Sequence, residues 1–235
     1  MQNNNQNEKA GDKINDFVQK NRKAIFMILG IIVFLLAGSV VVLSVSDVLR
    51  KKAIADVEEL SRRYDELRHE IIADSHEGHT HDDVSVDLDT ETLLDDLNVF
   101  AKGKSGFAGS KAWSIIAKIH GDRKEWPAAE YAWLNAAKAG SKTYQGPVSF
   151  FNAAVAAEEQ GKWEQAIEYY EKSISLPVEF PAAPHAQFSV GRLYEDKLNN
   201  FSAAIEAYRL VLIKWPNIPV WVNLANSRII ALEIP

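Results

Sequence analysis

The chain has 235 residues, no cysteine and a net charge of −6 at pH 7. Without cysteine it can form neither a disulfide nor a thiolate metal site, and the small negative charge argues against a general nucleic-acid-binding protein. A chain of this length has room for one or two domains.

Residues 1–23 are interpreted as a tail that precedes a membrane segment. Met1 to Gly11 is rich in Asn and Gln and has no apolar anchor, so it is predicted to be disordered. A short amphipathic stretch follows and ends in the basic residues Lys20, Arg22 and Lys23.

Ala24 to Val45 is an apolar run interrupted only by glycine and serine. As a helix rising about 1.5 Å per residue it would span roughly 33 Å, enough for a hydrocarbon core of about 30 Å. It lacks the polar stripe of a core helix and is longer than the apolar part of a signal peptide. The sequence predicts an uncleaved signal anchor over residues 24–46, and cleavage near Ser44 is the alternative.

The charges beside this anchor do not decide its orientation. Basic residues near the membrane on the two sides are Lys13, Lys20, Arg22 and Lys23 before it, and Arg50, Lys51 and Lys52 after it. The positive-inside rule compares these two sets, and they nearly balance. The short amino-terminal tail slightly favours a cytoplasmic amino terminus.

Residues 47–73 are predicted to form a charged helix, the stalk helix. Its apolar seam repeats at spacings of three and four and consists of Ala53, Val57, Leu60, Tyr64, Leu67 and Ile71. Such a seam either forms a dimerising stalk or packs on the following helices as an amino-terminal cap. Packing is favoured, because a helical array needs its open end covered and the seam is short for a coiled coil.

Residues 74–90 are predicted to be an acidic loop that contains three histidines. From Asp74 to Asp96 there are nine carboxylates and no Lys or Arg. His76, His79 and His81 are candidate ligands for Zn²⁺, Ni²⁺ or Cu²⁺, which imidazole binds well. The alternative is a solvated loop, since no helical His pair or cysteine defines a coordination geometry.

Residues 91–109 are predicted to be an amphipathic helix followed by a glycine linker. The helix would pair with the stalk helix to form a degenerate repeat before the others. Gly103-Lys104-Ser105-Gly106 looks like part of a phosphate loop. A Walker A motif would need glycine where Asn98 stands and a preceding strand, so a linker is the better interpretation.

Residues 110–235 are predicted to form a repeat domain, in which Lys111 to Pro216 repeats one pattern three times. Each copy has an aromatic residue, an alanine three positions later and a second aromatic four positions after that. The copies are Trp126, Ala129 and Trp133; Trp163, Ala166 and Tyr170; Phe201, Ala204 and Tyr208. An earlier segment of each copy carries a large residue before a small one: Trp113 and Ala117, Phe150 and Ala154, Val190 and Gly191. The small residues allow two helices to cross closely.

This pattern resembles the tetratricopeptide repeat, a pair of antiparallel helices of about 34 residues. The clearest copy runs from Pro147 to Val178, and the third ends on Pro216. The resemblance implies an all-α fold: one amino-terminal transmembrane helix, then an α-solenoid of about three TPR-like helix pairs with capping helices at both ends. Pro219 to Ile234 would form the carboxyl-terminal cap. A generic bundle with alanine-rich seams is the alternative.

In this family the first helix of each pair lines a concave groove that binds peptides or partner helices. The matching positions are Lys111, Ser114 and Lys118 in the first copy, Val148, Phe151, Val155 and Glu158 in the second, and His185, Phe188, Arg192 and Glu195 in the third. The lysine-based set with which some members hold a carboxylate is absent. The groove would therefore have an apolar centre at Phe151 and Phe188, unless the carboxyl-terminal cap buries them.

The whole layout also resembles the YfgM-like membrane-anchored repeat proteins of bacterial envelopes. The likeness lies in Phe17 to Lys23 before one membrane helix, then a charged helix and degenerate repeats. That family is an accessory subunit of the SecYEG translocon and works beside periplasmic chaperones. The resemblance implies a single-pass protein of the bacterial cytoplasmic (inner) membrane with periplasmic repeats. Its partners would be translocon subunits, periplasmic chaperones or exported clients.

Other functions remain open at this point. One is an envelope-assembly scaffold for the cell wall or outer membrane, and another is metal binding or sensing by the three histidines. No cofactor and no nucleic-acid partner is expected, and a homodimer through the stalk helix is an alternative. An enzyme is not expected, because the chain has no His-Glu-x-x-His helix, G-x-S-x-G elbow or dinucleotide fingerprint.

Overall fold

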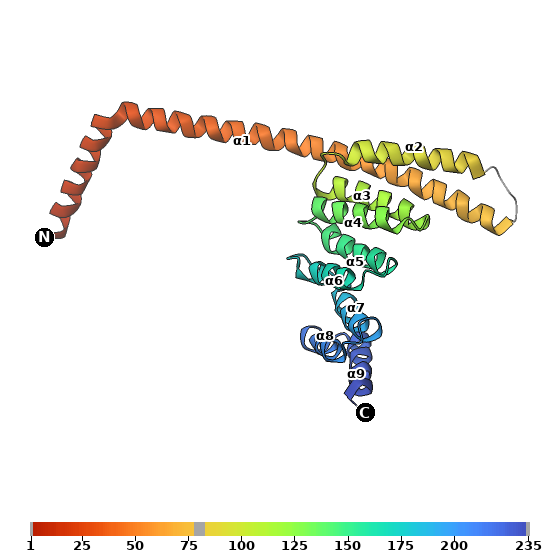
Figure 1. The fold of residues 1–235 in the computed structure, drawn as a ribbon. Helices are drawn as coiled ribbons and strands as arrows, with labels where there is room; N and C mark the ends of the chain where they lie inside the picture. Colours follow the sequence, from red (N-terminus) through yellow and green to blue (C-terminus); the bar gives the residue numbers. More distant parts are fainter. Residues whose placement is uncertain (1, 78–82, 234–235) are drawn as a thin grey trace. The chain divides into compact units, whose positions relative to one another are not determined.

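The computed structural model describes residues 2–77 and 83–233 and divides the chain into two units, Met1–Lys52 and Ala53–Pro235. In the described residues the secondary structure is entirely helical (Figure 1). Helix α1 (Gln2–Glu77) contributes residues to both units. The prediction of an all-α fold is confirmed.

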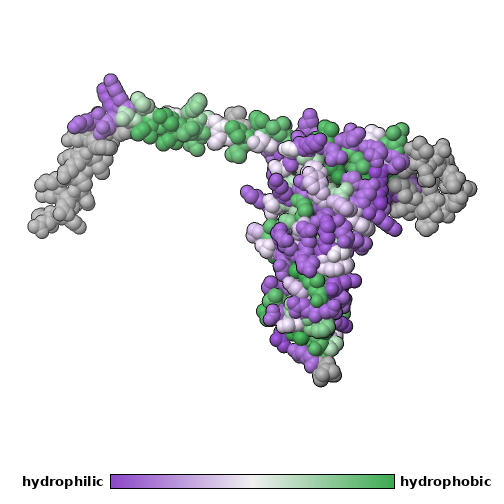
Figure 2. Space-filling view, in the orientation of Figure 1, coloured by the Kyte–Doolittle hydropathy of each residue, from purple (hydrophilic) through white to green (hydrophobic). Residues whose placement is uncertain are grey.

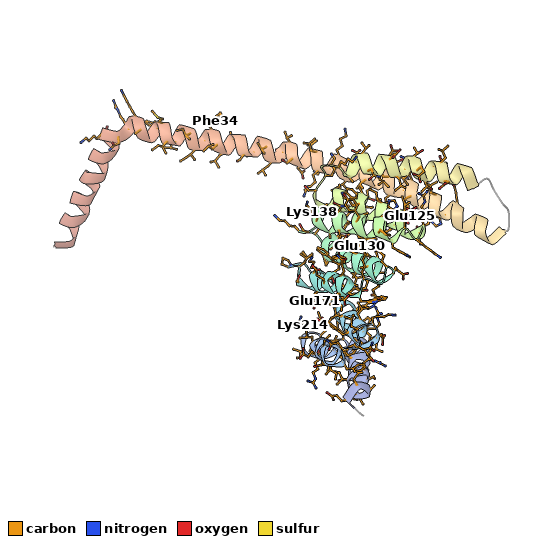
Figure 3. All side chains as sticks on the ribbon, in the orientation of Figure 1. Phe34, Glu125, Glu130, Lys138, Glu171 and Lys214 are labelled. Atoms are coloured by element: carbon orange, nitrogen blue, oxygen red, sulfur yellow. The ribbon has the colours of Figure 1, made fainter. Side chains whose placement is uncertain are left out.

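In the first unit, α1 begins at Gln2, where the sequence predicted a disordered tail. The stretch before the apolar run contains no proline, so no residue there blocks the helix from continuing. The large apolar side chains that the structure describes in this unit are exposed; Phe34, for example, is 77% exposed and projects outward in Figure 3. Figure 2 shows apolar residues in green along this segment, with paler residues between them. By length and composition, this segment can cross a membrane.

The second unit continues with helices that pack in chain order (Figure 1). They are α2 (Asp83–Ala101), α3 (Gly106–Asp122), α4 (Trp126–Ala139), α5 (Gln145–Glu158), α6 (Trp163–Ser175), α7 (Ala183–Asp196), α8 (Phe201–Lys214) and α9 (Pro219–Glu233). The three predicted pairs are α3 with α4, α5 with α6 and α7 with α8.

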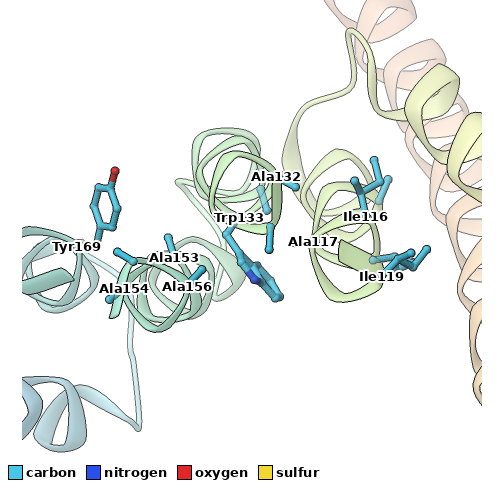
Figure 4. Close-up of a cluster of buried hydrophobic side chains, with 14 of the residues drawn as sticks. Ile116, Ala117, Ile119, Ala132, Trp133, Ala153, Ala154, Ala156 and Tyr169 are labelled. Atoms are coloured by element: carbon cyan, nitrogen blue, oxygen red, sulfur yellow. The ribbon is translucent and has the colours of Figure 1, made fainter. Parts of the chain in front are cut away.

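The core of this unit is built on small residues where helices cross. Ala117 and Ala154 are fully buried; Figure 4 shows Ala117 on the helix that faces Trp133, and Ala154 on the helix that faces Tyr169. The third copy has Gly191 at the crossing. A Cβ there would lie 2.5 Å from Cε1 of Tyr208, so α7 and α8 approach too closely for any other residue.

The turn inside each helix pair uses the same backbone conformation. Lys124, Gly161 and Asn199 have φ values of 60°, 71° and 51°, and each lies two residues before the second helix of its pair. This left-handed conformation favours glycine and tolerates asparagine. It reverses the chain in all three copies, including the third, which has one extra residue before Phe201.

The stalk seam packs inside the second unit. Val57 and Tyr64 are buried in the same cluster as Leu93 and Leu97 of α2, and the cluster extends into α3. Arg63 of α1 pairs with Asp96 of α2 at 2.6 Å. The last part of α1 and α2 thus form a helix pair that covers the first repeat, and this packing leaves the dimerising alternative without support.

Helices replace most of the predicted acidic loop and part of the glycine linker. Helix α1 continues to Glu77, α2 begins at Asp83 rather than at residue 91, and α3 begins at Gly106. Asp87 and Glu91 of α2 pair with Arg123, next to the end of α3, at 2.7 and 2.5 Å, so part of the negative charge is neutralised where α2 packs. A charge-rich composition therefore does not exclude a helix here.

Candidate functional site

A cleft with a volume of about 390 Å³ opens between α5, α7 and α9. It is lined by Phe151, Val155, Glu158, Glu159, Tyr170, His185, Phe188, Ser189, Arg192 and Trp221. The structure therefore brings together the predicted groove positions of the second and third copies, except Val148 and Glu195. Val148 is 37% exposed on α5 outside this cleft, and Glu195 is buried.

Aromatic rings form the walls of the cleft. Phe151 lies 5.0 Å from His185 and 5.1 Å from Tyr170, measured between ring centroids. Phe188 lies 5.6 Å from Trp221, and Trp221 stacks on His185 at 4.7 Å with an interplanar angle of 15°. Phe151 and Phe188 are both half-buried, so α9 covers the apolar centre only in part and also supplies one of its walls.

Sequence analysis assigned Trp221 only to the cap and missed its place in the cleft. Helix α9 follows α7 with an offset of 36 residues, which aligns Arg228 with Arg192 and Trp221 with His185. The same offset would have identified α9 as the first helix of an incomplete fourth pair. Its Trp221 then occupies a groove position.

Two charged residues that line the cleft, Arg192 and Glu158, neutralise each other. Arg192 of α7 donates to both carboxylate oxygens of Glu158 on α5, at 2.8 and 2.7 Å. The hydroxyl of Tyr170 donates to the same carboxylate at 2.7 Å, and burial together with Glu158 raises the pKa of Tyr170. Neither charge is therefore free to grip the terminus of a peptide.

This three-residue contact recurs one unit later and is absent one unit earlier. Glu195 accepts hydrogen bonds from Tyr208 at 2.8 Å and from Arg228. The corresponding positions of the preceding unit, 37 residues before Glu158, Tyr170 and Arg192, are Gly121, Trp133 and Val155. All three residues are therefore replaced together in the preceding unit, so none of them is left there without its partners.

The predicted groove positions of the first copy do not join the cleft. Lys111 pairs with Glu58 of α1 at 2.6 Å, and the Lys118 ammonium lies 6.0 Å from the centre of the Tyr64 ring. The hydroxyl of Ser114 donates to the carbonyl oxygen of Ser110 at 2.8 Å. The helix pair that precedes the first repeat therefore engages both lysines.

The candidate metal ligands fall largely outside the described structure. His79 and His81 lie in residues 78–82, and the side chain of His76, near the end of α1, is likewise not described. Within the described residues, no group of three His, Cys, Asp or Glu side chains is arranged to hold a metal ion.

Comparison with known proteins agrees with this architecture. The tetratricopeptide repeat family matches residues 151–219, which include most of the cleft. Over 230 residues the chain is 33% identical to a TPR repeat-containing protein of Treponema pallidum (strain Nichols), and the match covers 94% of each chain. The chain therefore belongs to the tetratricopeptide repeat proteins, whose helical arrays are protein–protein interaction modules.

Proposed function

We propose that this protein is a single-pass membrane protein of the bacterial envelope whose repeats bind apolar segments of exported polypeptides. Its partners are translocon subunits, periplasmic chaperones or the exported clients themselves, and it acts without catalysis. The observation that carries this proposal is the aromatic cleft between α5, α7 and α9, in which Arg192 is already paired with Glu158.

The lining of the cleft suits an apolar side chain better than a charged one. Phe151, Phe188 and Trp221 offer aromatic surface, and Val155 adds an aliphatic wall. A volume of about 390 Å³ lies within the usual range for ligand sites. Burying one large apolar side chain there is worth roughly 1.5–3 kcal/mol, and extended exported chains carry many such side chains before they fold.

The membrane anchor supports the location. The helix over residues 24–45 exposes apolar side chains on all sides and is flanked by basic residues at both ends. An aqueous environment would not stabilise so large an apolar surface. We place this segment in the cytoplasmic membrane and the repeats on its periplasmic side.

Photo-crosslinking from the cleft tests the proposal. A photo-reactive amino acid replaces Phe188 in the full-length protein in its native membrane, and Tyr131 is the matched control because it is 65% exposed on α4, outside the cleft. We expect translocon subunits, periplasmic chaperones or exported chains to be crosslinked from position 188 only. Equal yields at both positions would refute the cleft as the site, and partners from cell-wall or outer-membrane assembly would favour a scaffold instead.

Topology is tested separately. A reporter that is active only outside the cytoplasm is fused after Pro235. We expect the fusion to be active. A silent but well-expressed fusion would place the repeats in the cytoplasm and exclude translocon and chaperone partners on the periplasmic side.

A further inference from the structure

We infer that His185 makes the cleft sensitive to protons: the cleft holds an apolar segment while the imidazole is neutral and releases it once the imidazole is protonated. This inference rests on the proposed function, because it concerns regulation of the same cleft.

The position of His185 carries the argument. The residue lies in the first turn of α7, and its ring lies between Phe151 of α5 and Trp221 of α9, at 5.0 and 4.7 Å. The His185 ring packs against these two rings, but the residue still reaches solvent at the cleft. An apolar segment between these walls would cover the ring and remove water from it, and loss of water disfavours the charged form.

The groups that face His185 also oppose a second positive charge. Burial and then Arg192 lower the pKa of His185 below its ordinary value of 6.5, while Glu158 acts in the opposite direction. Because Arg192 and Glu158 are bonded to each other, their opposite effects on His185 largely cancel, and burial of the ring is the main cause of the lowered pKa. The other carboxylate of the lining, Glu159, is exposed to solvent, and the lining residue from α9 is the uncharged Trp221.

The repeat architecture itself does not require histidine here. The equivalent positions are Lys111 in the first copy and Val148 in the second, and Trp221 in α9. Among these four helices, only α7 has a titratable ring at this position. The helical repeat can therefore form without a histidine between the two aromatic walls.

The consequence is a linkage between ligand and proton. If a segment binds the neutral form better, its binding expels a proton from His185. The affinity then stays constant above the pKa of His185 and falls by up to about tenfold per pH unit below it.

The experiment uses the full-length protein in detergent micelles and a short, labelled, end-blocked peptide that contains phenylalanine and no ionisable side chain. Its dissociation constant is measured from about pH 8 to about pH 5, the range in which histidine titrates. The variants are His185→Gln and the matched control His120→Gln. His120 pairs with Glu125 at 2.6 Å, outside the cleft.

We expect the affinity of the wild type and of His120→Gln to fall as the pH is lowered, and that of His185→Gln to stay constant. An equal fall in His185→Gln, or no fall in the wild type, would overturn the inference while leaving the proposed function intact. If the peptide did not bind at any pH, both the inference and the proposed function would be refuted.

Discussion

Arg192 of α7 donates two hydrogen bonds to the carboxylate of Glu158 on α5, at 2.8 and 2.7 Å. The pair joins the second repeat to the third at the edge of the cleft. The side chain of Glu158 is only 16% exposed, so this carboxylate depends on its partners for much of its solvation. The same link to the first repeat is missing, because Gly121 and Val155 stand at the equivalent positions.

Replacing Arg192 by methionine should lower the free energy of unfolding by about 1–3 kcal/mol, because it leaves a largely buried carboxylate without its cation. Urea unfolding followed by circular dichroism measures this. Lys172→Met is the matched control, since Lys172 pairs with Glu168 on an exposed surface, and such pairs contribute about 0–1 kcal/mol. An Arg192→Met variant as stable as the control would show that the pair does not stabilise the array.

Adding one methyl group at Gly191 should lower the free energy of unfolding by about 1–3 kcal/mol. The new Cβ would lie 2.5 Å from the ring of Tyr208, which is itself fully enclosed and cannot move aside. Gly121→Ala is the matched control, because the nearest atom to its Cβ would be 3.8 Å away on Trp126. In that helical position alanine should be neutral or stabilising by up to about 1 kcal/mol. Thermal unfolding of the two variants in parallel distinguishes them.

Val57→Asp should destabilise the second unit by about 3 kcal/mol or more, because it buries an unpaired charge or polar group among Leu93 and Leu97. Ala55→Asp, on an exposed part of α1, should have little effect. Urea unfolding measures the difference, and light scattering reports the mass of each variant. A lower mass for Val57→Asp with unchanged stability would instead favour the dimerising stalk.

The stability of the array should fall in acid partly through Glu130 of α4. This buried carboxylate accepts hydrogen bonds from Gln160 at 2.7 Å, Lys162 at 2.8 Å and Tyr169 at 3.0 Å. Burial acts to raise its pKa, but these three donors outweigh burial and hold the pKa below its ordinary value of 4.5. The pKa is thus lower in the folded state than in the unfolded state. Its contribution is present above pH 4.5 and is lost as the pH falls through the folded-state pKa.

The measurement that tests this compares the free energy of unfolding of the wild type with that of Glu130→Gln as a function of pH. We expect the wild type to be the more stable at neutral pH and the difference to shrink as the pH falls below 4.5. Glu171→Gln, at an exposed position on α6, serves as the control and should show no such narrowing. A constant difference between wild type and Glu130→Gln would show that Glu130 does not link folding to pH.

Local patterns were enough to predict most of the fold. The spacing of Ala129, Ala166 and Ala204 indicated three helix pairs, and Gly161 indicated the turn in the clearest of them. Helix formation and close crossing depend on residues a few positions apart, so one sequence contains both signals. The apolar segment over residues 24–45 could be predicted for the same reason, because its composition involves consecutive residues only. The acidic stretch was predicted as a loop up to residue 90, whereas α2 begins at Asp83, because composition alone does not show that Arg123 pairs with Asp87 and Glu91.

The sequence alone determined that this chain forms a helical repeat array with a segment apolar enough to cross a membrane. Only the tertiary structure decided what the groove offers a ligand. It placed Trp221 beside His185, paired Arg192 with Glu158 and engaged Lys111 with α1. These contacts join residues more than 30 positions apart, and the packing of whole helices determines which side chain meets which partner.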